Sequence, residues 1–460
     1  MMPPGRAILT AQRMSDVASP PLPHTATGNG QTPSSCGDGS ICRVEVAAEV
    51  QPLAWLAGRP EGELCFWADR DGHEEIAASG ILTEVAGNAA PGAAVWMERI
   101  AAHLEAADEG VRFYGGTRFD PQAPVAPEWR TLGAYRFVVP RFEAVRRDGR
   151  KLLACNFRAA ERDGLPALLA DLQRPPATIP EPAGSVRLRR DVDEPDHGGW
   201  ATLVRTALAA IDDPTEPLNK VVVARRTGAT AAAPITPAAL LAAMSRSDDR
   251  SFRFVVQPRH GTAFVSVTPE RLFSLFGRTV HTEAIAGTRR RGASPKDDDR
   301  LRRELAASAK DVLEHRIVHD AIARALTGLC TDTAAGATTV LSLPALQHLM
   351  SRLSGELAPG IGIADLVDAL HPTPAVGGEP AEAARRFLTR HEPFDRGWYA
   401  APVGWVGHGE ASFAVAIRSA LIDGRSVSLY TGNGLVNGSC PDAEWAELEA
   451  KIGCYFTPGG

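Results

Sequence analysis

The chain has 460 residues, 44% hydrophobic and 23% charged, which is ordinary for a globular protein with a large core. The net charge of −6 is mild, so neither nucleic acid nor an anionic membrane is expected as the main partner. No apolar run approaches the roughly 20 residues of a membrane-spanning helix, and the first residues lack the apolar core of a secretory signal. The seven cysteines show no CxxC spacing, so we expect free thiols in a reducing, cytoplasmic compartment.

In chain order, the first predicted segment is a disordered tail over residues 1–42, which are rich in Pro, Gly, Ser and Thr. A single large domain follows over residues 43–460. Its stretch 131–157 predicts a pair of strands that turns at Asp148-Gly149. Residues 175–186, PPATIPEPAGSV, read as a proline-rich connector.

Beyond the connector the pattern predicts a helix over 199–211 and strands at KVVVARR (220–226), SFRFVVQ (251–257) and TAFVSV (262–267). A Gly/Arg loop at 286–292 leads to one long helix that starts near Ser294. Further strands are expected in FAVAIRSALI (413–422) and SVSLYTG (426–432), and a last helix starts near Pro441. Strands interspersed with long helices indicate an α+β layered fold.

The segment ASAKDVLEHRIVHD (307–320) places Glu314 on the apolar side of the long helix, because Ile317 and Val318 share its face. A buried carboxylate is costly unless it has a partner. Lys310, four residues earlier, is one candidate partner, and a bound metal ion is the other.

The last helix carries a second acidic group, in which Glu444, Glu447 and Lys451 share a face. A solvated face with a Glu447–Lys451 pair is the simpler explanation. The alternative is that Glu314 and Glu447 together bind Mg²⁺, which takes one or two protein carboxylates and completes its shell with water and substrate oxygens. The spacing leaves both explanations open.

Taken together, nine segments in one order resemble the chorismate-utilising enzymes, which include isochorismate, salicylate, anthranilate and aminodeoxychorismate synthases. The segments are NKVVVARR (219–226), TPERLF (268–273), AIAGTRRRG (284–292), ASAKDVLEHRIV (307–318), LQHLMSRLSG (346–355), LHPTPAVGG (370–378), EPFDRGWYAAPVGW (392–405), AIRSA (416–420) and GNGLVNGSCPDAEWAELEAK (432–451). The resemblance covers a catalytic core at 199–458 and is much weaker over 43–198.

The resemblance implies one large chorismate-binding domain in which two antiparallel sheets pack together with helices outside. It also implies a requirement for Mg²⁺. Glu314 and Glu447 match the family's metal ligands, and Glu444 matches a neighbouring glutamate. On this interpretation Glu314 holds the metal, and the metal holds the ring carboxylate of the substrate.

The resemblance further implies isochorismate synthase activity, in which water adds at C2 of chorismate and the C4 hydroxyl leaves. Lys220 matches the base and Glu270 the acid. The lysine must lose its proton, and the glutamate must gain one, so both need shifted pKa values. An edge-strand lysine and a surface glutamate are the alternatives that the residues alone favour.

Three positions select this branch of the family. Ala286 stands where the aminodeoxychorismate branch has a lysine nucleophile, and enzymes that use ammonia generally lack a lysine at position 220. The loop around Ala375 is more similar to isochorismate synthases than to salicylate synthases. A salicylate synthase and a non-catalytic chorismate-binding relative remain the alternatives.

The remaining pocket residues follow from the same resemblance, since chorismate is a dianion and needs cationic groups and N–H donors. Arg418 matches the residue that grips the enolpyruvyl carboxylate, and His348 matches a pocket histidine or is a satisfied core residue. Further substrate contacts are expected at Gly287, Thr288, Ala375, Tyr399, Gly434 and Lys451. The neighbouring run Arg289–Arg291 reads as a solvated loop.

Three positions depart from the usual family motifs. Val267 replaces a small residue before Glu270, Ala401 adds a methyl group, and Asn433 stands within GNG in place of GAG. We expect Val267 to crowd the strand that leads to the acid. The resemblance implies no glutamine amidotransferase subunit, because water replaces ammonia, and a product that feeds siderophore, menaquinone or salicylate-derived compounds. We expect a monomer, although the sequence leaves the oligomeric state open.

Overall fold

The computed structural model of the chain describes residues 39–59, 62–89, 92–173, 186–245, 250–344 and 346–456. The predicted tail falls outside these ranges up to residue 38, and β1 (Ile41–Ala47) starts within its last two residues. The predicted connector at 175–186 lies outside the described residues except for Val186. No helix in the described ranges is long and apolar enough to cross a membrane.

The strands of the described chain join into one hydrogen-bonded network of 20 strands whose ladders are antiparallel. The network has two arms that meet at β3 and β5. The first arm runs through β5 (Tyr135–Arg147), β3 (Glu74–Gly87), β2 (Leu64–Ala68), β9 (Phe252–Arg259), β10 (Thr262–Thr268), β19 (Ser419–Asp423), β20 (Ser426–Leu435) and β8 (Lys220–Ala231). Strands β7 (Leu188–Glu194) and β16 (Gly378–Glu379) pair with β8.

The second arm leaves the other edge of β5. It runs through β4 (Phe113–Thr117), β17 (Pro402–Gly407), β18 (Glu410–Val415), β11 (Arg271–Phe276), β12 (Thr279–Arg290) and β15 (Leu346–Leu357). Strands β13 (Cys330–Ala335) and β14 (Thr339–Ser342) pair with β15, while β6 (Arg150–Arg158) and β1 continue from β5. The predicted antiparallel α+β fold is confirmed, and its two sheets are the arms of one continuous network.

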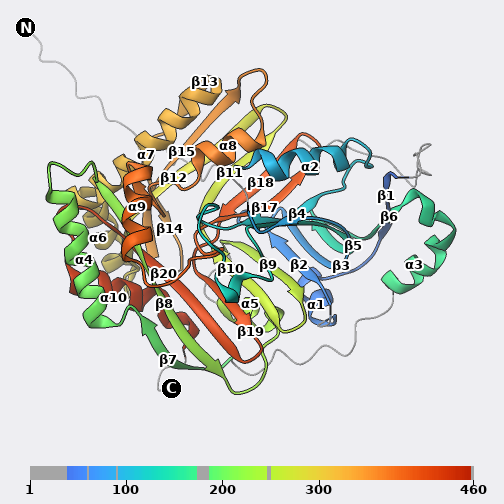
Figure 1. The fold of residues 1–460 in the computed structure, drawn as a ribbon, viewed down its shortest axis with the longest axis horizontal. Helices are drawn as coiled ribbons and strands as arrows, with labels where there is room; N and C mark the ends of the chain where they lie inside the picture. Colours follow the sequence, from blue (N-terminus) through green and yellow to red (C-terminus); the bar gives the residue numbers. More distant parts are fainter. Residues whose placement is uncertain are drawn as a thin grey trace, which may run out of the picture.

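Helices cover the network unevenly. Figure 1 shows α4 (His197–Asp212), α6 (Pro295–Ala307), α7 (Ala309–Leu329), α9 (Ala381–His391) and α10 (Pro441–Ile452) gathered at one end, around β8, β12, β15 and β20. The short helices α1 (Pro52–Ala57) and α5 (Pro237–Ser245) contact the first arm, and α3 (Leu165–Gln173) contacts β6. The remaining α2 (Ala94–Leu104) and α8 (Ile363–Leu370) contact each other.

Strands of the first arm are buried on both faces. Along β10, Phe264 belongs to the large core shared with the second arm, whereas Val265 and Val267 belong to a second core under α1 and α5. Strand β9 alternates in the same way, with Phe254 in the first core and Val255 in the second. This double burial explains why these strands read as continuous apolar runs.

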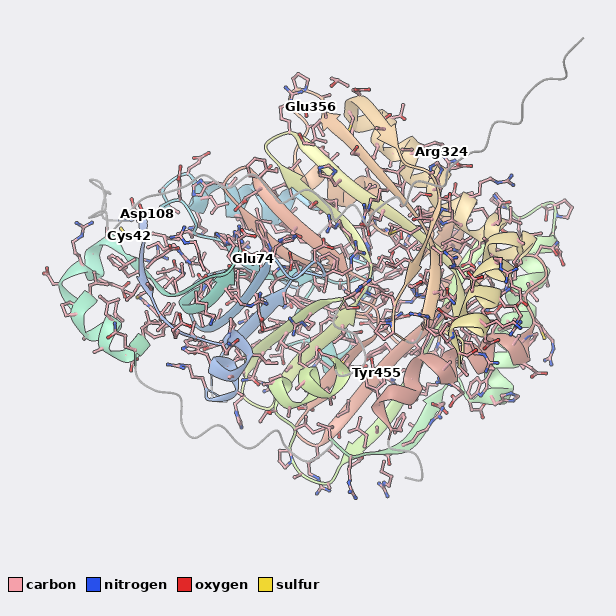
Figure 2. All side chains as sticks on the ribbon, turned by 180° about the vertical axis from the view of Figure 1, so that it is seen from behind. Cys42, Glu74, Asp108, Arg324, Glu356 and Tyr455 are labelled. Atoms are coloured by element: carbon pink, nitrogen blue, oxygen red, sulfur yellow. The ribbon has the colours of Figure 1, made fainter. Side chains whose placement is uncertain are left out.

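Charged side chains are also buried away from the helical end. Glu74, labelled in Figure 2, lies at the start of β3 with 8% of its surface exposed and pairs with Arg112 at 2.8 Å. Such burial is tolerated because the charges are paired. The predicted hairpin is confirmed, since β5 and β6 are joined by Asp148 and Gly149, both with positive φ.

Three sequence predictions need correction. The single helix expected from Ser294 is two helices, because Ser308 ends α6 and its side chain accepts a hydrogen bond from Asp311 N to begin α7. The run FAVAIRSALI breaks at Arg418, which has a φ of 48°, so that β18 and β19 lie in different arms. The expected Gly/Arg loop is mostly strand, because β12 continues to Arg290.

Candidate active site

A cavity of about 120 Å³ lies where the two arms meet the helical end of the molecule. Its walls come from β8, β12, β15 and β20, from α7 and α10, and from two crossovers between the arms. One crossover links β10 to β11 and carries Glu270, and the other links β18 to β19 and carries Arg418. The crossovers run side by side, because Val415 N donates to Glu270 O at 3.0 Å and Val267 N donates to Arg418 O at 3.2 Å. We call this space the charged cavity.

Glu270 is a buried carboxyl group whose ionised form is disfavoured. Its surface is 5% exposed, and burial raises its pKa to about 7, although the ammonium of Lys220 acts in the opposite direction. A carboxyl group with this pKa is about half protonated at neutral pH. It can therefore donate a proton under conditions where an exposed glutamate cannot.

Arg418, His348 and Thr288 form a second group in the cavity wall. Arg418 Nη2 lies 3.4 Å from His348 Nε2, and Thr288 Oγ1 lies 3.1 Å from His348 Nδ1. Because a guanidinium can only donate, Nε2 accepts and Nδ1 carries the ring proton. Burial and the charge of Arg418 lower the pKa of His348 to about 3, so the ring is neutral. Arg418 has a left-handed backbone with a φ of 48°, which is unusual for a residue other than glycine, and it lines the charged cavity.

Lys220 lies directly behind the cavity wall and is fully buried. Its Nζ is 3.0 Å from Glu314 Oε1, which identifies the partner of Glu314 in this structure. A side chain on Gly434 would clash with Glu314 Oε1, and its Cβ would lie 3.2 Å from Lys220 Nζ. Only glycine at this position leaves the lysine and glutamate their space.

Lys310 pairs with Glu444 at 2.7 Å, and this partner lies 134 residues away in the sequence. The proposed pairing of Lys310 with Glu314 is therefore not the main one. Burial lowers the pKa of Lys310, but the charges of Glu444, Glu314 and Glu447 outweigh it and raise the pKa overall. The ammonium thus lies under the influence of all three carboxylates that were singled out as metal candidates.

Asn433 connects the remaining charged groups. Its Nδ2 donates to Glu444 Oε2 at 3.0 Å, and its Oδ1 accepts from Lys451 Nζ at 2.7 Å. Lys451 also pairs with Glu447 at 2.8 Å, as the simpler explanation of the last helix expects. The face is only partly solvated, since the side chain of Glu447 is 32% exposed whereas Glu444 is 2% exposed and burial raises the pKa of Glu444.

The structure brings the predicted site residues together. All of them except Lys220 line the charged cavity, and Lys220 pairs with the lining residue Glu314. The lining members are Glu270, Gly287, Thr288, Glu314, His348, Ala375, Tyr399, Arg418, Gly434, Glu444, Glu447 and Lys451. Sequence reasoning missed Arg289, Lys310 and Asp311 as lining residues. Arg289 pairs with Asp311 at 2.8 Å and does not belong to a solvated loop. The signal for Asp311 and Lys310 was their spacing of three and four residues before Glu314.

The donor set suits a hard divalent cation. Glu314, Glu444 and Glu447 supply carboxylate oxygens to one cavity, and Mg²⁺ requires only one or two of them. Within the described ranges, no three His, Cys, Asp or Glu side chains already converge as a metal cage. Each of the three carboxylates is instead held by a lysine.

The three departures from the family motifs take different places. Val267 packs into the second core and does not line the charged cavity. Ala401 is fully buried and is not a lining residue. Asn433 is the departure with a role in the site, as the bridge between Glu444 and Lys451.

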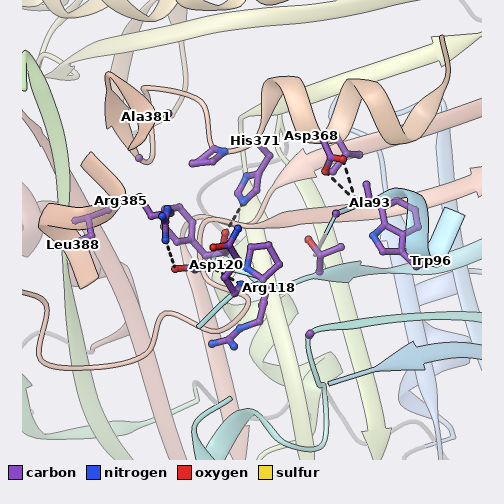
Figure 3. A pocket seen from close by; sticks show the side chains of 18 residues that line it. Ala93, Trp96, Arg118, Asp120, Asp368, His371, Ala381, Arg385 and Leu388 are labelled. Carbon is purple, nitrogen blue, oxygen red and sulfur yellow. Dashed lines mark hydrogen bonds and ion pairs between the residues drawn. The ribbon is translucent and has the colours of Figure 1, made fainter. Parts of the chain in front are cut away.

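A second cavity of about 110 Å³ shares the segment 371–377 with the charged cavity. Figure 3 shows its labelled side chains, among them Trp96, Arg118 and Leu388. Its polar side chains form hydrogen bonds with neighbouring backbone atoms: His371 Nε2 lies 3.1 Å from Phe119 O, and Asp368 Oδ1 accepts from Ala93 N at 3.0 Å.

Comparisons with known proteins agree with this geometry. A family model described as "Chorismate binding enzyme" matches residues 36–456. The chloroplastic isochorismate synthase of Catharanthus roseus is 36% identical over 363 residues, which cover 75% of this chain and 62% of that protein. The chain thus spans less than two thirds of the length of this plant relative.

Solved structures extend the likeness to the whole fold. The menaquinone-specific isochorismate synthase MenF from Escherichia coli superposes with a TM-score of 0.79 at 28% identity, covering 93% of this chain and 96% of MenF. Anthranilate synthase component I from Streptococcus pneumoniae, at 16% identity and a TM-score of 0.61, covers 94% of this chain and 95% of its own and shares the fold. The charged cavity, the two-armed sheet and the family match over 36–456 lead to one assignment: the chain belongs to the chorismate-binding enzyme family.

Proposed function

We propose that the chain is an isochorismate synthase, a hydroxymutase that converts chorismate to isochorismate. The observation that carries the proposal is a carboxyl group with a pKa of about 7, Glu270, facing the same cavity as the buried Lys220–Glu314 pair. The names of the relatives from Catharanthus roseus and Escherichia coli support it, since both are isochorismate synthases.

In the proposed reaction Lys220 accepts a proton from the water that forms the new C–O bond at C2. Glu270 gives a proton to the C4 hydroxyl, which leaves as water when its C–O bond breaks. One water enters and one leaves, and the double bonds of the ring shift between the two carbons. The burial of Glu270 supports its assignment as the acid, because burial raises its pKa to about 7 and favours the neutral carboxylic acid that the step needs.

The other lining residues bind the substrate in this proposal. Arg418, held by His348, takes the enolpyruvyl carboxylate, and Thr288 and Gly287 lie on β12 beside them. Further contacts come from Tyr399, Ala375, Gly434 and Lys451. Gly287 has a φ of 75°, a conformation that glycine adopts easily, and an added Cβ would lie 3.0 Å from Asp311 Cβ.

We also propose that Mg²⁺ is held by Glu314 and Glu447, with Glu444 beside them. When bound, the ion would supply positive charge for the ring carboxylate. The charge count of the site supports this: Glu270, Asp311, Glu314, Glu444 and Glu447 face Lys220, Arg289, Lys310, Arg418 and Lys451, five acids against five bases. A dianion entering so balanced a site needs a cation to accompany it.

The proposal includes a monomeric, cytoplasmic enzyme that works without a glutamine amidotransferase subunit, because its nucleophile is water. Its product would feed siderophore, menaquinone or salicylate-derived compounds. Among the relatives are MenF from Escherichia coli and a salicylate biosynthesis isochorismate synthase from Pseudomonas aeruginosa.

The test is to incubate the chain with chorismate and Mg²⁺ and to separate the products by chromatography. Isochorismate as the main product is the expected result. Salicylate with pyruvate would instead make the chain a salicylate synthase, and binding of chorismate without turnover would make it a non-catalytic relative. Omitting Mg²⁺ and adding EDTA provides the matched control.

A further inference from the structure

The ammonium group of Lys310 lies near negatively charged side chains that would also attract a metal cation. Its Nζ lies 2.7 Å from Glu444 Oε1, and its charge interacts with those of Glu314 and Glu447 as well. These are the three carboxylates of the proposed metal site. We propose that Lys310 is an internal counter-ion, which pairs with Glu444 in the metal-free protein and is displaced when a divalent cation binds.

The three lysines of the site differ in their freedom to leave. The side chain of Lys220 is 0% exposed and that of Lys451 is 17% exposed, whereas that of Lys310 is 36% exposed. Lys451 is further tied to Asn433 at 2.7 Å and to Gly432 O at 2.9 Å. A lysine has a long flexible stem that can carry its ammonium group into solvent at little cost. Lys310 is therefore the lysine that can yield its place.

Glu444 would keep its position after Lys310 leaves. Asn433 Nδ2 donates to Glu444 Oε2 at 3.0 Å and to Glu444 O at 2.7 Å, and the asparagine is 2% exposed. One oxygen of the carboxylate is thus fixed by the amide, and the oxygen that Lys310 contacts becomes available. At Glu444 the exchange needs only a side-chain movement of Lys310, because Asn433 already fixes the position of this carboxylate.

The inference rests on the proposed Mg²⁺ site and predicts the direction in which metal affinity changes when Lys310 is replaced. If Lys310 competes with the metal, removing its charge must strengthen metal binding. If Lys310 instead only orders Glu444 for the metal, removing it must weaken metal binding.

The experiment compares the metal-free full chain with Lys310→Met and Lys310→Arg. Binding of Mn²⁺ is followed by loss of the EPR signal of the free aqueous ion, and binding of Mg²⁺ by calorimetry, both without substrate. Lys151→Met is the matched control, because Lys151 forms a pair with Glu49 at 2.8 Å but does not line the charged cavity. Thermal melting with and without Mg²⁺ checks folding and gives an independent reading of binding.

We expect Lys310→Met to bind Mn²⁺ and Mg²⁺ about tenfold more tightly than the wild type, since a repelling charge is gone. Its melting temperature should be lower without metal and should rise more on adding Mg²⁺. Lys310→Arg and Lys151→Met should bind as the wild type does. Equal or weaker binding by Lys310→Met would overturn the counter-ion role. Absence of binding by both wild type and Lys310→Met would overturn the Mg²⁺ proposal itself, a different result.

Discussion

The charged cavity and the second cavity have similar volumes, about 120 and 110 Å³, and share the segment 371–377, but their polar groups serve different ends. In the second cavity they fasten loops and helix ends, as Asp368 does at the start of α2. In the charged cavity three lysines hold three glutamates, and a protonatable carboxyl group faces them. Space alone therefore does not mark the site; the concentration of buried charge does.

The largest expected loss of activity comes from a change at Lys220, the buried lysine behind the wall of the charged cavity. Lys220→Ala should lower kcat by about 10²–10⁴-fold while chorismate still binds, because the base is lost but the residues that hold the substrate remain. Steady-state kinetics and substrate titration measure the two effects. Lys151→Ala is the control. A kcat of Lys220→Ala near that of the wild type would remove Lys220 from the mechanism.

The second largest effect is expected at the proposed metal ligands. Glu447→Gln should raise the Mg²⁺ concentration needed for half-maximal activity by about 10–100-fold, because a neutral amide replaces a charged ligand. A Mg²⁺ titration at saturating chorismate measures it. Glu382→Gln, on the exposed face of α9, should change nothing. An unaltered metal requirement in Glu447→Gln would assign the ligand elsewhere.

Gly434 tests how tightly the charged cavity is built. Gly434→Ala should reduce kcat/KM by about tenfold or more, because the new methyl group would push Glu314 and Lys220 out of place. The control is Gly328→Ala in α7, where an added Cβ meets nothing within 4 Å. Equal activity of the two variants would contradict the geometry described for the Lys220–Glu314 pair.

The pH dependence should follow Glu270. With a pKa of about 7, its protonated fraction falls as the pH rises through 7, so kcat/KM should fall about tenfold per pH unit on the alkaline side. A profile from about pH 6 to 9 measures this limb. In Glu270→Gln the limb should vanish along with most of the activity, and a limb that persists there would belong to another group.

The smallest effect on catalysis is expected from the second cavity. Leu388→Ala should lower the free energy of unfolding by about 2–5 kcal/mol, because it removes a buried side chain beside an existing cavity. KM and kcat should stay near wild-type values. Val312→Ala, at a 44% exposed position, is the control for stability. A large change of KM in Leu388→Ala would mean that the two cavities are coupled through their shared segment.

Local patterns predicted much of the fold. The Asp148-Gly149 hairpin and the last helix from Pro441 follow from turn residues and periodicity. The break at Ser308 was missed because serine interrupts a helical pattern only weakly, and the break at Arg418 because arginine rarely adopts a left-handed backbone.

The site was harder to predict from residues alone. Helical spacing put Lys310 and Glu314 on one face, but the lysine pairs with Glu444, whose approach depends on where the sheet network places α7 and α10. The two crossovers that bring Glu270 and Arg418 side by side are also a property of the whole sheet network. The resemblance to a family identified these residues, because it carries long-range geometry that periodicity lacks.

The most direct test of the central claim is to run the reaction in ¹⁸O-labelled water with Mg²⁺ and to weigh the product by mass spectrometry. If Lys220 activates water and Glu270 releases the C4 hydroxyl, isochorismate must carry one solvent oxygen at C2. Unlabelled isochorismate would contradict the account, because the hydroxyl would then have moved without passing through water.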